Sequence, residues 1–132
     1  MDPSIALYSL FAPFLLWPFE YLFPYPHIVE ELAKAVIVFL VLKSKVSLSQ
    51  YLKTFSLAGV LFALSETVLY IINLNLFGRV SLIFIRFLST AVIHSLTFLI
   101  IGYLGYKNKR LLWLGLLIAI LAHYLYNLLV TP

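Results

Sequence analysis

The chain has 132 residues, of which 64% are apolar and only 11% are charged. Soluble domains carry about 25% charged and about 45–50% apolar residues, so this composition excludes an ordinary soluble domain, and it equally excludes a disordered chain. The net charge is +4, but the basic residues do not gather on one polar face, so we expect no nucleic-acid partner. The chain lacks cysteine, which excludes disulfides and thiol catalysis. The class that remains is a small integral membrane protein.

Long apolar segments follow one another along the whole chain. A helix needs about 20 mostly apolar residues to cross a bilayer core that is roughly 30 Å thick. The sequence therefore predicts an all-α, polytopic transmembrane bundle that forms a single domain over residues 1–132. The first segment is the least regular, because it contains Pro13, Pro18 and Glu20. The expected spans cover about residues 4–23, 27–43, 53–73, 80–106 and 110–129.

Basic residues lie in the loops after the second and fourth predicted spans. Short loops rich in lysine and arginine mark the cytoplasmic side of a membrane protein. With five spans both loops face one side, and the opposite side holds only Arg79. This pattern predicts a cytoplasmic N-terminus and is compatible with contacts to membrane lipid head groups. The two groups are Lys43, Lys45 and Lys53, and Lys107, Lys109 and Arg110.

Ionisable side chains also occur inside the predicted spans, where they are costly and indicate a functional site. Four of them lie 13 residues from a basic residue of the predicted cytoplasmic boundary, namely Glu30, Glu66, His94 and His123. A helical rise of 1.5 Å per residue places all four about 20 Å above that boundary. One shared polar cavity, nearer the outer face, explains this common level.

The spacing within each helix predicts which side chains face the same way. Residues four apart lie on one helix face, so Glu30 can pair with Lys34. The adjacent Glu31 points about 100° away, and we expect the two glutamates to have different roles. The same spacing joins two further pairs, Glu66 with Tyr70 and His123 with Asn127.

Two carboxylates and two imidazoles around one cavity suit the activation of water. A carboxylate in a low-dielectric site can act as a general base, and a histidine with an asparagine can donate hydrogen bonds to an oxyanion. Glutamate and histidine are also ordinary ligands of catalytic zinc. The sequence lacks an HExxH pattern, so a site without a cofactor and a zinc site both remain open, the latter with Glu30, Glu66, His94 and His123 as ligands.

Four short motifs resemble those of the PrsW intramembrane proteases. Residues 30–34 (EELAK) resemble an EExxK motif, residues 62–66 (FALSE) an FAxxE motif, and residues 123–127 (HYLYN) an HxxxN motif. His94, downstream of Arg86 in the next span, resembles the family's third motif. The motifs occur in the family's order, one in each span, over about residues 27–129. The lysine of the first motif and the glutamate that ends the second favour this family over the related CAAX-prenyl endopeptidase and bacteriocin-processing family.

The resemblance implies an endopeptidase that cuts membrane-anchored protein or peptide substrates in a prokaryotic plasma membrane. It suggests that Glu30 and His94 activate water, with Glu31 in support and braced by Lys34. His123 and Asn127 would then donate to the oxyanion, and Glu66 would orient a histidine or complete a metal site. We expect supporting roles for Tyr70 and Arg86, the latter pairing with a carboxylate or anchoring the outer interface, and an ordinary loop position for His27.

A different function compatible with the same residues is a small carrier or channel for protons or metal ions, because chains of carboxylates and histidines also mark ion paths. A carrier usually shows inverted repeats, and the sequence has no internal repeat. A scaffold subunit would leave the common level of the polar residues unexplained.

Overall fold

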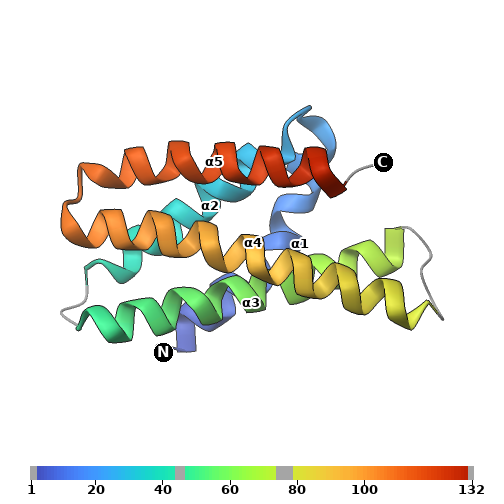
Figure 1. Cartoon of the computed structure of the whole chain (residues 1–132), viewed down its shortest axis with the longest axis horizontal. Coiled ribbons are helices and arrows are strands. Elements are labelled where there is room, and N and C mark those ends of the chain that lie inside the picture. The colour runs from blue at the N-terminus through green and yellow to red at the C-terminus, as the bar shows by residue number, and fades with distance from the viewer. Residues whose placement is uncertain (1–2, 44–46, 74–78, 131–132) are drawn as a thin grey trace.

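The computed structural model of the chain describes residues 3–43, 47–73 and 79–130. All regular structure in these ranges is helical, which confirms the predicted all-α bundle (Figure 1). Lys45, one of the residues predicted to face the cytoplasm, lies outside the described ranges. The helices are α1 (Pro3–Leu22), α2 (Pro26–Val41), α3 (Leu48–Asn73), α4 (Val80–Lys107) and α5 (Leu111–Val130).

Four of these helices, α1, α3, α4 and α5, are long and apolar enough to cross a membrane. Their outward faces carry many exposed large apolar side chains, such as Leu15, Val92 and Trp113, which suit lipid better than water. The helix at the second predicted span, α2, is not among these four helices, although the sequence predicted five spans. Helix α2 has 16 residues, about 24 Å at 1.5 Å per residue, and this falls short of a bilayer core of about 30 Å.

The short α2 begins part-way along the length of the bundle. At the end of the molecule where α3 finishes, the α3–α4 pair extends beyond the connection between α1 and α2 (Figure 1). We call this the cavity end. The opposite end, where α2 finishes and α5 begins, carries Lys43, Lys53, Lys107 and Arg110, and we call it the basic end. The two predicted basic loops thus meet at one end of the bundle, as expected.

Helix α3 starts five residues before its predicted boundary, at Leu48 and not near Lys53. The cause is a capping box, in which two residues each accept, through a side-chain oxygen, a hydrogen bond from the backbone N–H of the other. The hydroxyl of Ser47 accepts from the N–H of Gln50 at 3.4 Å, and the Gln50 amide oxygen accepts from the N–H of Ser47 at 3.2 Å. Hydropathy alone does not detect such a polar first turn.

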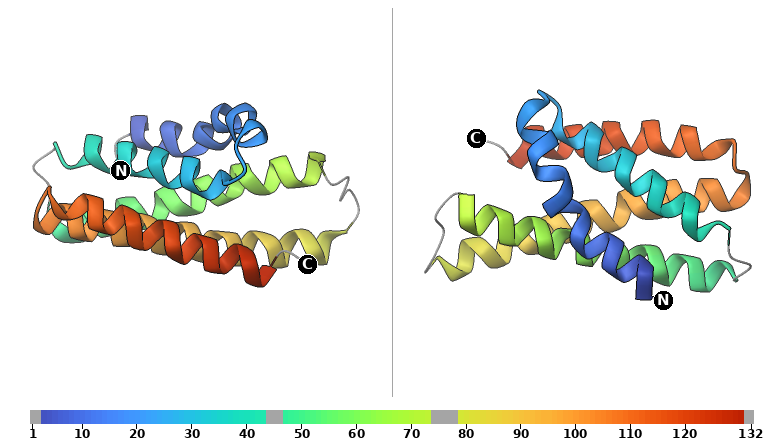
Figure 2. Two further views of the ribbon diagram at one scale, coloured as in Figure 1. Left: turned by 90° about the horizontal axis from the view of Figure 1, so that it is seen from above. Right: turned by 180° about the vertical axis from the view of Figure 1, so that it is seen from behind.

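Helices α3, α4 and α5 form one layer, and α1 and α2 lie across one of its faces (Figure 2). Small residues allow the helices of the layer to approach closely. A Cβ atom at Gly59 of α3 would clash with the backbone of Ser95 in α4, and one at Gly115 of α5 would lie 3.0 Å from the Ile101 Cα atom. The contact at Gly59 fixes the part of α4 that carries His94.

Helix α1 remains continuous although it contains Pro13 and Pro18. A proline inside a helix removes one backbone hydrogen bond and leaves a carbonyl group available to other donors. The hydroxyl of Ser65 in α3 donates to the carbonyl of Leu10, which is next to the Ser9 carbonyl to which Pro13 cannot donate. This contact holds α1 against α3, directly beside Glu66.

Candidate active site

Helix α2 supplies four buried ionisable side chains, namely His27, Glu30, Glu31 and Lys34. Pro26 begins the helix, where its missing N–H costs nothing. Glu30 is 7% exposed, whereas Glu31 and Lys34 are completely buried. Both glutamates lie in the second turn of α2.

Lys34 holds the centre of the site together. Its ammonium group donates to the Glu31 carboxylate at 2.5 Å and to the Thr97 hydroxyl at 3.0 Å, and it lies 2.6 Å from His94 Nδ1. These contacts use all three of its donors. The predicted pair of Lys34 with Glu30 is therefore wrong. Positions three and four residues away are both within reach on a helix, and Glu31 shares the side of α2 that faces α4 and α5.

His123 of α5 faces both glutamates. Its Nδ1 atom lies 2.7 Å from the Glu31 carboxylate and 3.7 Å from Glu30 Oε2. A carboxylate only accepts hydrogen bonds, so we assign the ring proton to Nδ1, which leaves Nε2 with its lone pair. The interpretation of His27 as an ordinary loop residue is wrong. His27 lies buried in the first turn of α2, and its ring centre is 5.5 Å from that of Tyr124 and 6.2 Å from that of His123.

His94 of α4 lies between a cation and a carboxylate. Its Nδ1 atom faces Lys34, and its Nε2 atom closely contacts Glu66 Oε2. The ring is completely buried, 4.8 Å from the Phe62 ring and 5.1 Å from the His123 ring, measured between centres. Glu66 thus contacts a histidine, and its role, to orient that histidine or to complete a metal site, stays a prediction.

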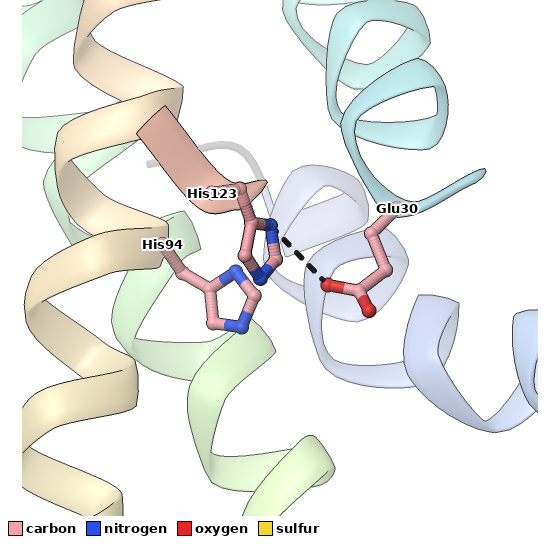
Figure 3. Close-up of side chains that lie close together, drawn as sticks. All are labelled: Glu30, His94 and His123. Carbon is pink, nitrogen blue, oxygen red and sulfur yellow. Dashed lines mark ion pairs between the residues drawn. The ribbon is translucent and has the colours of Figure 1, made fainter. Parts of the chain in front are cut away.

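Glu30, His94 and His123 point toward one another from three different helices (Figure 3). One oxygen or nitrogen atom of each lies within 4.8 Å of the others. In addition, Glu30 Oε2 is buried without a hydrogen-bond partner. Ligands about 2.0–2.2 Å from a tetrahedral metal ion lie about 3–4 Å apart, so a small inward movement of these side chains would complete the spacing. The donor set is one that binds divalent metal ions, and binding would require His94 to exchange its contact with Glu66 or Lys34 for the ion.

A cavity of about 370 Å³ lies beside these residues at the cavity end. It brings together Glu30, Glu66 and His123 with Tyr70 and Asn127, whereas the buried Glu31, Lys34 and His94 lie behind its wall. Helix α1 contributes Trp17, Glu20 and Tyr21, which the sequence did not assign to the site. The remaining lining residues are Pro26, Leu69 and Asn73.

Arg86 lies next to Tyr70 and outside the cavity lining. Its guanidinium carbon is 3.4 Å from the centre of the Tyr70 ring. Among the residues that the structure describes, Arg86 makes no ion pair, and its Nε atom is buried without a hydrogen-bond partner. The side chain stacks on the residue that lines the cavity, so the expected pairing with a carboxylate is not seen among the described residues, and the supporting role stays a prediction.

Comparison with known families gives one match. The profile described as PrsW family intramembrane metalloprotease matches residues 18–132. The chain belongs to this family. The match begins near the end of α1 and includes α2 to α5, so it contains every residue of the site except Trp17. No match is found among curated proteins or solved structures. Membership in the PrsW family makes this integral membrane protein an intramembrane peptide hydrolase.

Proposed function

We propose that the protein is an endopeptidase that hydrolyses membrane-anchored protein substrates at the polar cavity, in a prokaryotic plasma membrane. The observation that carries this proposal is the convergence of Glu30, His94 and His123 around an unpartnered carboxylate oxygen beside a cavity. The family match supports the reaction class. We assign the catalytic roles below to residues of this chain.

Glu30, His94 and His123 are the residues that would hold a divalent ion such as zinc, with Glu66 next to them. The ion would supply Lewis-acid chemistry when bound. Glu31 supports this role of His123, because a carboxylate on the second ring nitrogen fixes the orientation of a metal-binding histidine. Lys34 neutralises Glu31 and keeps this pair in place.

The remaining polar residues of the cavity act on the water and the substrate. We assign Glu66 as the group that accepts a proton from the attacking water and passes it to the leaving nitrogen as the C–N bond breaks. Asn127 and Tyr70 donate hydrogen bonds to the oxygen of the attacked carbonyl group, where negative charge develops. All three line the same cavity wall as Glu30.

The packing below the cavity favours hydrolysis over transport of protons or metal ions. A carrier needs a polar path that continues toward the other side of the membrane. Between the site and the basic end, Val38, Phe55, Phe98 and Ile101 are completely buried and apolar. The polar residues thus border a cavity at one end of the bundle.

The test is cleavage of a transmembrane peptide by the purified protein in liposomes, followed by mass spectrometry. We expect cleavage that phenanthroline abolishes, one zinc ion per chain, and loss of both zinc and cleavage in His123→Ala. Lys53→Gln, an exposed change at the basic end, is the control and should keep both. Cleavage that persists in His123→Ala would refute the assigned site, and ion flux without cleavage would favour a carrier.

A further inference from the structure

Glu20 is a half-buried carboxylate that the catalytic roles above do not use. Trp17, Glu20 and Tyr21 occupy positions i, i+3 and i+4 of α1, so they share one helix face, and all three line the cavity. In the part of the chain that the structure describes, Glu20 has no hydrogen-bond or ion-pair partner. An unpaired carboxylate within a membrane span is costly, which indicates a function.

The charges around the cavity leave Glu20 without compensation. Lys34 balances Glu31, with which it forms an ion pair. A divalent ion in the proposed site would balance the two remaining carboxylates, Glu30 and Glu66. No lysine or arginine is among the lining residues, and Arg86 stacks on Tyr70 outside the lining, so no basic side chain faces Glu20 inside the cavity.

The neighbours of Glu20 suit a positively charged ligand. Trp17 and Tyr21 line the same cavity as Glu20, and the faces of aromatic rings attract cations. The attraction between a carboxylate and a cation is also stronger where water is partly excluded. The same cavity holds the proposed hydrolytic residues, so a cation bound here would belong to the substrate itself.

We propose that Glu20 determines specificity by binding a lysine or arginine side chain of the substrate close to the scissile bond. This inference rests on the proposed function. The cavity lies at the end of the bundle opposite the basic end, and the predicted orientation places that end on the outer side. Membrane proteins carry few basic residues on that side. A recognised lysine or arginine there would therefore select a small group of substrates.

The experiment uses a host peptide of about 20 apolar residues with one variable position, moved residue by residue through its outer half and occupied by Lys, Arg, Gln or Glu. We measure kcat/KM for the full-length protein in liposomes. At one register the wild type should prefer Lys or Arg to Gln by about tenfold or more. Glu20→Gln should reduce this ratio to about one, and Glu20→Lys should favour the Glu peptide. Glu20→Asp, which keeps the charge, should retain part of the preference.

Binding separates this inference from the proposed function. The Glu66→Gln variant should bind a fluorescent Lys peptide more tightly than its Gln counterpart, and adding Glu20→Gln should remove the difference. Lys53→Gln serves as the control for a charge change elsewhere. Cleavage with the same Lys-to-Gln ratio in wild type and Glu20→Gln would overturn the inference and leave the protease intact. Charge-selective binding without cleavage of any peptide would refute the protease and keep the cation site.

Discussion

Different forces hold the two ends of the bundle together. Toward the basic end the completely buried side chains are apolar, as at Val38, Phe55 and Ile101. Toward the cavity end they are ionisable, as at Glu31 and Lys34. Apolar packing tolerates small adjustments, whereas a buried charge is stable only while each of its partners stays in place. The comparison separates the part of the fold that provides stability from the part that provides chemistry.

The largest expected effect is on activity, from a change at the cavity end that keeps the shape of the side chain. Glu66→Gln retains the volume but cannot accept a proton, so we expect kcat to fall by about 10²- to 10⁴-fold. The unfolding midpoint in detergent should change little. A variant that keeps wild-type kcat would remove Glu66 from the proton-transfer role and leave it as the residue that orients His94.

The next effect is on stability, and it tests whether the cavity end depends on paired charges. Lys34→Met leaves the buried Glu31 carboxylate without its cation, which should cost about 3–5 kcal/mol of unfolding free energy. The double variant Lys34→Met with Glu31→Gln removes both charges and should recover a large part of that loss. Equal stability of the single and double variants, measured by denaturant unfolding in detergent, would contradict this account of the pair.

The sequence predicted the level of the site but not its internal pairing. Depth in a membrane is one-dimensional, so counting residues from the basic positions was enough to place Glu30, Glu66, His94 and His123 together. The choice of Glu31 over Glu30 as the partner of Lys34 depends on how α2 is rotated, and packing against other helices determines that rotation. The start of α3 was missed for another reason, because hydropathy does not detect the capping hydrogen bonds of Ser47.

The position of α1 was the other feature that sequence patterns could not supply. Helix α1 runs obliquely across the layer of α3, α4 and α5 (Figure 2). No periodicity within α1 encodes this crossing, because it arises from contacts with other helices. The sequence therefore showed Glu20 only as an irregularity in an apolar segment, although it lines the cavity with Glu30 and Glu66.

A third, smaller effect tests the boundary between the two ends. Gly59→Val places a branched side chain against the backbone of Ser95, where even a Cβ atom would clash. We expect a loss of about 1–3 kcal/mol of unfolding free energy and lower zinc occupancy, since the ring of His94 would shift. Gly115→Ala is the matched control, because its contact with the Ile101 backbone is looser. Unchanged zinc content in Gly59→Val would show that the site tolerates movement of α4.

The smallest effect is expected at the basic end, and it tests whether stability there can change without a change in activity. Ile101 is completely buried in the apolar core, and Ile101→Val removes one methylene group without introducing a charge. The unfolding free energy should decrease by about 0.5–1.5 kcal/mol, while kcat and zinc content remain at wild-type values. A clear decrease in kcat at a temperature where the variant is fully folded would mean that packing near the basic end is coupled to the site. The two ends would then have to be treated as one cooperative unit.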